Sequence, residues 1–155
     1  MTRSTVARWA LIALTILPAL GLVACGGGSG GGSDANYVAA ICSAEKKFTD
    51  SLQAVTSDPA VLTDANALTA KLAPAFDQFA KDFAKASPPS DVKDWHTATS
   101  KQFADMAASL KTGKDLQSLF SSDGAAVPDP PQAASDRLSK VAATNKDCLA
   151  TGTFQ

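Results

Sequence analysis

The chain has 155 residues and a formal net charge of −1. Without Arg3 and Arg8, which lie near the N-terminus, 12 basic residues stand against 15 acidic ones, a balance of −3. A chain of this length supports one domain, and a mildly acidic one lacks the basic surface that nucleic-acid binding requires. Its only glutamate is Glu45 and its only histidine is His96, which restricts the catalytic chemistry available.

The first 24 residues have the pattern of a secretory signal peptide. Met1 to Arg8 is short and basic, Trp9 to Leu17 is almost wholly apolar, and Pro18 precedes a run of small residues. The apolar part up to Ala24 is shorter than the roughly 20 residues that a membrane-spanning helix needs. The pattern therefore predicts a cleaved leader over residues 1–24 in preference to a stable transmembrane segment.

The end of this leader, Leu22-Val23-Ala24-Cys25, resembles the lipobox of bacterial lipoproteins. The resemblance implies cleavage between Ala24 and Cys25 and attachment of diacylglycerol to the Cys25 sulfur. Two or three acyl chains hold a protein stably on a bilayer, because each buried CH₂ contributes about 0.8 kcal/mol. The implied location is the extracytoplasmic side of a bacterial cell membrane, which in a diderm host includes the outer membrane. The alternative is an ordinary cleavage site with a chance cysteine.

Glycine and serine alone occupy Gly26 to Ser33, which we call the tether. Such a composition predicts a flexible coil about 16 Å from end to end. A cloning linker has the same composition, but a leader would not normally be kept in front of one. The chain then divides into a signal peptide (1–24), a lipidated cysteine with its tether (25–33) and a folded domain (34–155).

The domain reads as helical throughout. The first helix is predicted from about Ala35 to Thr56, with Asp34 as its N-cap. A second helical stretch is predicted to open at Asp58-Pro59, with a kink or short break near residues 70–73, because Pro74 removes a backbone donor. The predicted inward faces of these two stretches carry Val38, Ile41, Phe48, Leu52 and Val55, then Leu68, Leu72, Phe76, Phe79 and Phe83.

Two further long helices are predicted in the second half. Ser87-Pro88-Pro89-Ser90 indicates a stop and a restart, with Ser90 as N-cap of a helix that ends at Gly113. A short helix over residues 114–122 and a proline-rich loop over residues 125–131 precede a last helix, from about Gln132 to Ala150, which ends at Gly152. This pattern predicts an all-α fold, a four-helix up-down bundle with one short extra helix. A looser orthogonal array is the alternative.

Cys42 and Cys148 are predicted to form a disulfide, as expected for an even pair in an exported domain. Closing a loop of more than one hundred residues contributes about 4–5 kcal/mol in the chain-entropy model. If the first and last helices are antiparallel, the bridge places Glu45 opposite Asn145. We expect a hydrogen bond between them, because burying either alone would cost several kcal/mol. A structural pair is the favoured interpretation, and a ligand-binding carboxylate is the alternative.

Few other residues suggest chemistry. His96 beside Trp95 could contact a ligand, although packing against neighbours explains the pair more simply. One histidine and one glutamate exclude a ferritin-like di-metal site, and we predict neither a metal nor a cofactor. A helical aromatic set is far more often core than pocket, and this one comprises Phe76, Phe79, Phe83, Trp95, Phe103, Met106 and Phe120.

The sequence therefore predicts a binding or interaction module, lipid-anchored on the extracytoplasmic side, with no catalytic constellation and an envelope protein as its partner. The alternative is a small-molecule-binding lipoprotein with its ligand in the bundle core. An enzyme using exposed aspartates ranks third, because no catalytic motif surrounds any serine and the aspartates lie mostly at helix starts.

Overall fold

The computed structural model describes residues 31–113 and 129–154, and these residues form helices and connecting turns without a strand. The predicted all-α fold is confirmed. None of the helices in these two ranges is both long and apolar enough to cross a membrane. The elements are α1 (Asp34–Thr56), α2 (Pro59–Leu62), α3 (Ala65–Ala84), the 3-10 turn η1 (Ser90–Val92), α4 (Lys93–Lys111), α6 (Gln132–Ala142) and α7 (Lys146–Thr151).

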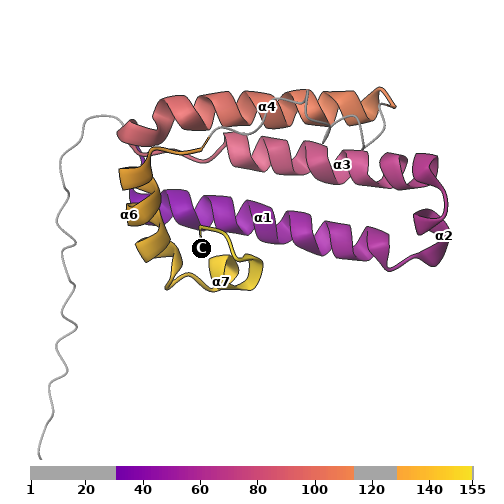
Figure 1. Ribbon diagram of the computed structural model, residues 1–155, viewed down its shortest axis with the longest axis horizontal. Helices are drawn as coiled ribbons and strands as arrows, with labels where there is room; N and C mark the ends of the chain where they lie inside the picture. The colour runs from indigo at the N-terminus through magenta and orange to yellow at the C-terminus, as the bar shows by residue number, and fades with distance from the viewer. Residues whose placement is uncertain (1–30, 114–128, 155) are drawn as a thin grey trace, which may run out of the picture.

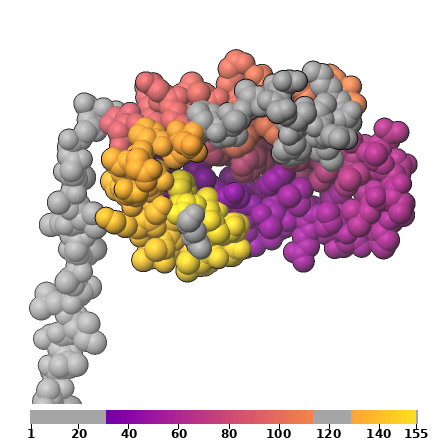
Figure 2. All heavy atoms as spheres, viewed as in Figure 1, coloured from indigo at the N-terminus to yellow at the C-terminus, as the bar shows by residue number. Residues whose placement is uncertain are grey.

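Three long helices, α1, α3 and α4, lie side by side with successive helices running in opposite directions, and α3 packs against both of the others (Figure 1). The short helices α6 and α7 pack against α1. Figure 2 shows them over the beginning of α1, while its later turns stay visible on the same face. The last long helix predicted for the bundle is divided into two short ones, α6 and α7.

Side-chain caps explain where the first three helices begin. The Ser33 hydroxyl accepts a hydrogen bond from the Asn36 amide at 3.3 Å, so α1 starts one residue earlier than predicted, with Ser33 as its N-cap. Asp58 caps α2 as predicted, with Pro59 in the first turn. Asp64 caps α3 by accepting from the amides of residues 66 and 67. The second helical stretch is therefore divided at residues 63–64, which separate α2 from α3.

Helix α3 continues through Pro74, so of the predicted kink or short break near residues 70–73, the break is not formed. The proline ring is exposed, and residues on either side of it, Leu72, Ala73 and Ala80, are buried against the neighbouring helices. Packing against α1 and α4 outweighs the loss of one backbone hydrogen bond, which tertiary context often does to local propensity.

Two other helix boundaries differ from prediction. Ser90 is not an N-cap, because residues 90–92 form a 3-10 turn and α4 starts at Lys93. The last helix breaks after Ala142, because Asn145 adopts an extended backbone and its side chain caps α7. The predicted helix ends at Gly113 and Gly152 are confirmed, and both glycines have positive φ. The predicted short helix over 114–122, with Phe120, lies outside the described residues, as do residues 125–128 of the predicted loop.

The core is concentrated at one end of the molecule, where α1 begins, α3 ends and α6 and α7 attach. The buried disulfide between Cys42 and Cys148 lies in it, and the predicted pairing is confirmed. Farther along α1, the predicted inward residues Phe48, Leu52 and Val55 are only half-buried. The buried cluster consists of Tyr37, Val38, Ile41, Cys42, Phe83, Ala86, Val92, Ala134, Leu138, Ala142 and Cys148.

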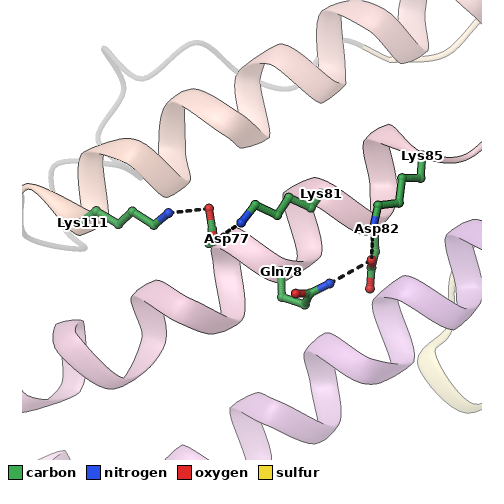
Figure 3. Close-up of polar contacts among 6 residues, drawn as sticks. All are labelled: Asp77, Gln78, Lys81, Asp82, Lys85 and Lys111. Atoms are coloured by element: carbon green, nitrogen blue, oxygen red, sulfur yellow. Dashed lines mark hydrogen bonds and ion pairs between the residues drawn. The ribbon is translucent and has the colours of Figure 1, made fainter.

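Ion pairs along α3 connect it to both neighbours, and Figure 3 shows the pair between Lys111 of α4 and Asp77. Asp77 accepts from Lys111 of α4 at 2.6 Å and from Lys81 of its own helix at 2.7 Å. Asp82 lies 3.5 Å from Lys47 of α1. The hydrogen bonds from Lys111 and Lys81 hold the pKa of the Asp77 carboxyl below its usual value. Water screens these exposed pairs, so they fix alignment more than they add stability.

The cap at Asn145 gives a direct test of the divided C-terminal segment. Because Asn145 Oδ1 accepts from the amides of residues 147 and 148, at 2.9 and 3.2 Å, replacing it with alanine removes both bonds. We expect Asn145→Ala to lower the free energy of unfolding by about 1 kcal/mol, measured by chemical denaturation. Asn145→Asp keeps the acceptor and serves as the matched control. Equal losses in both variants would contradict the capping role.

Candidate functional site

A pocket lies at the end of the molecule where α1, α2 and α3 meet. We call this end of the molecule the corner. It is about 250 Å³ in volume and combines three apolar side chains with one carboxylate and one ammonium group. The adjacent Leu62 is 52% exposed although it is large and apolar. Such a surface can bury a partner's apolar group while placing a charge beside it. The lining residues are Ala54, Val55, Asp58, Val61 and Lys71.

Local sequence builds this corner. The Asp58 side chain accepts from the amide of Ala60 at 3.0 Å, which starts α2 and turns the chain sharply after α1. The four-residue helix buries Val61 and leaves Leu62 facing solvent. The sequence analysis predicted the Asp58-Pro59 start but did not identify a site here. The sequence feature that could have indicated the site is the apolar pair Val61-Leu62. It follows the Asp58 cap in a helix too short to bury both side chains.

His96, a predicted ligand residue, is instead part of a buried polar contact between α1 and α4. Its Nδ1 hydrogen-bonds the Tyr37 phenol at 3.1 Å, and its Nε2 lies 3.4 Å from the Ser100 hydroxyl. The imidazole is 5% exposed and stacks on the ring of Phe83, with centroids 4.9 Å apart. Burial lowers the pKa of His96, opposed by a hydrogen bond with the backbone of Ala84, and burial raises the pKa of Tyr37. Both side chains are therefore neutral at physiological pH.

The remaining aromatic candidates pack on one another. Phe83 contacts Trp95 and Phe103, and Phe79 contacts Phe48. Trp95 is half-buried against the core. These ring contacts join α1, α3 and α4, so Phe79, Phe83, Trp95 and Phe103 belong to the core or pack against it.

The predicted hydrogen bond between Glu45 and Asn145 is wrong. Asn145 uses its side-chain oxygen to cap α7, and Glu45 accepts a hydrogen bond from the hydroxyl of Thr153. The cause is the break after Ala142, which turns residue 145 out of the helical register that the prediction assumed. Thr153 follows the left-handed Gly152, a position that helical periodicity could not place beside Glu45.

Arg137, which the sequence analysis did not identify, holds three segments together. Its Nε donates to Asp34 at the start of α1 at 2.6 Å, and its two terminal nitrogens donate to Asp91 at 2.8 and 3.0 Å. The guanidinium holds the pKa of the Asp91 carboxyl below its usual value. A bidentate contact of this kind combines charge with fixed geometry. Its one sequence signal was that Arg137 is the only arginine after residue 8.

Across residues 31–113 and 129–154, no three His, Cys, Asp or Glu side chains are grouped so that they could hold a metal ion. The chain matches no protein-family model, no curated protein and no solved structure.

The neutral His96 predicts a pH dependence of stability. Its folded-state pKa is below the unfolded value of 6.5, so its contribution is complete above pH 6.5. As the pH falls below that value, the unfolded chain binds a proton more readily than the folded one, and stability is lost. We expect the free energy of unfolding to decrease between pH 7 and pH 5 more steeply in the wild type than in His96→Gln. Parallel curves for the two proteins would contradict a buried neutral imidazole.

Proposed function

We propose that this chain is a lipid-anchored binding module that presents its corner to a protein partner in a bacterial cell envelope. The basic and apolar leader, the Leu22-Val23-Ala24-Cys25 sequence and the tether support an anchor on Cys25, on the extracytoplasmic side of a cell membrane. In a diderm host that membrane can be the outer one.

The observation that carries the proposal is the placement of the corner at the end opposite the tether. Helix α1 has 23 residues, so at 1.5 Å per residue it is about 35 Å long. Ser33, the last residue of the tether, caps its first turn, and two residues of its last turn, Ala54 and Val55, line the corner pocket. A chain anchored at Cys25 has its corner at the far end of this helix, where a partner has access to it.

The size of the corner pocket favours a protein partner over a free ligand. Pockets that enclose small-molecule ligands usually measure about 300–1,000 Å³. At about 250 Å³, with Leu62 exposed beside it, this one suits a single anchoring side chain of a protein surface. Lys71 and Asp58 then supply polar contacts at the edge of the contact area.

The alternative is a small-molecule binder with its ligand in the core. That alternative required polar side chains in the core to contact the ligand. Glu45 and His96 instead have protein partners in Thr153 and Tyr37. Neither side chain lines the corner pocket. We therefore rank the interaction module first.

The anchor is tested by replacing Cys25 with serine in the native host. We expect the wild type to co-float with membranes and to carry a lipid mass at its N-terminus, and Cys25→Ser to lose both, because the acylated sulfur is gone. Ser29→Ala, in the same tether, is the control and keeps both properties. Membrane retention of Cys25→Ser without lipid would contradict the anchor.

The corner is tested by crosslinking in intact envelopes. A photoreactive amino acid at Leu62 is compared with one at Leu149, which is 57% exposed but lies on α7. We expect one defined protein adduct from position 62, and its loss when Lys71→Glu is introduced, since that change reverses the charge of the pocket's ammonium group. The same adduct from both positions, or an adduct from position 149 alone, would contradict a partner at the corner.

A further inference from the structure

The last glycines of the tether are packed against the folded domain. The Gly32 amide donates a hydrogen bond to the Pro88 carbonyl at 3.0 Å, across the segment that joins α3 to η1. Gly32 is half-buried there. The prediction of free coil over the whole of Gly26 to Ser33 is therefore wrong for the end of the tether, because this backbone contact holds it.

Only glycine fits this contact. A Cβ atom on Gly32 would lie 2.0 Å from the Ser87 carbonyl oxygen, and one on Gly31 would lie 2.7 Å from the Ser90 amide nitrogen. Both obstacles are backbone atoms, which cannot rotate away as a flexible side chain can. Glycine allows the two backbones to approach this closely, so these two glycines have a role beyond chain flexibility.

The surface that receives the glycines is itself firmly held. Pro88 and Pro89 have restricted backbones, and the Pro89 carbonyl accepts from the Val92 amide at 3.1 Å. Pro89 and Val92 are both buried. Asp91, which directly follows Ser90, forms an ion pair with Arg137. Arg137 also pairs with Asp34, which lies three residues after Gly31 in the chain. The end of the tether is thus held against residues 87–90, a segment between the core residues Ala86 and Val92.

We propose that Gly31 and Gly32 form a docked strap that makes the end of the tether part of the domain and fixes which end of the domain faces the lipid. The orientation rests on the proposed lipid anchor at Cys25. Six residue steps separate Cys25 from Gly31, and a fully extended chain covers at most about 3.3–3.6 Å per residue. The strap end therefore stays within about 22 Å of the anchoring cysteine, whereas a tether free up to Asp34 would reach about 10 Å farther.

This arrangement gives the strap end a defined partner, the lipid headgroup surface. With the strap docked, the Ser87–Ser90 segment and the start of α6 lie nearest to the bilayer, and the corner lies at the far end of α1. Release of the strap would lengthen the free tether and let the domain reorient. The glycines at 31 and 32 thus determine orientation, while those at 26–28 determine slack alone.

The docking itself is tested on the mature lipidated protein in detergent. Gly32→Ala is compared with Gly28→Ala, an identical chemical change in the same tether. We expect Gly32→Ala to lower Tm by at least about 4 °C, because the added Cβ displaces the strap, and Gly28→Ala to leave Tm unchanged. Equal Tm values for the two variants would overturn the docked strap, and this comparison does not depend on membrane attachment.

The orientation is tested on the same proteins in vesicles containing dansyl-labelled headgroups. After leader removal Trp95 is the only tryptophan, and it lies near the start of α4 at the strap end. We expect energy transfer from Trp95 to be stronger than from a tryptophan at position 62 in Leu62→Trp/Trp95→Phe, and Gly32→Ala to reduce the difference. Equal transfer from both positions in the unaltered tether would overturn the fixed orientation. Failure to co-float with the vesicles would instead refute the lipid anchor, and the melting comparison would still decide the docking.

Discussion

The C-terminal part of the domain depends on the Cys42–Cys148 disulfide. Helix α7 has six residues, too few to be stable by itself in water, yet it ends in a left-handed glycine and buries Cys148 completely. The bridge joins this helix to α1 across a sequence separation of 106 residues. Because the covalent link fixes where α7 lies, Thr153 reaches Glu45, and the end of the chain becomes a second layer over the start of α1.

The two ends of the molecule differ in the contacts that hold them, and the disulfide lies at one end only. The disulfide, the Tyr37–His96 contact and the Arg137 ion pairs all lie at the end where the tether enters. The disulfide and the Tyr37–His96 contact are buried, and the exposed Arg137–Asp91 pair adds a bidentate contact with fixed geometry at this end. At the corner, by contrast, the four-residue helix α2 packs against α1 and α3. A firm end near the proposed anchor and an open end far from it suit a protein that presents a surface.

The rare residue types of this chain act as connectors. The single arginine after residue 8 links α6, the start of α1 and the η1 turn, and the single histidine links α4 to α1. The single glutamate, Glu45, accepts a hydrogen bond from the hydroxyl of Thr153. Arg137 was notable in the sequence only for its rarity, whereas Glu45 and His96 were also candidates for ligand contacts. Each of the three has a partner at least 46 residues away. Scarcity of such residues thus indicates tertiary connectors here, with the common aspartates serving as caps and surface ion pairs.

Local physics determined much of this protein from sequence alone. Helical periodicity, the caps at Asp58 and the glycines at 113 and 152, and the cysteine pair all follow from short-range propensity or from pairing rules, and the structure has them. The helix through Pro74 and the docking of Gly32 against Pro88 required the tertiary structure. In each of these, a local preference is overruled or completed by a segment distant in sequence. Periodicity carries no information about such a partner, because it describes one helix face and not the backbone or side chain that packs against it.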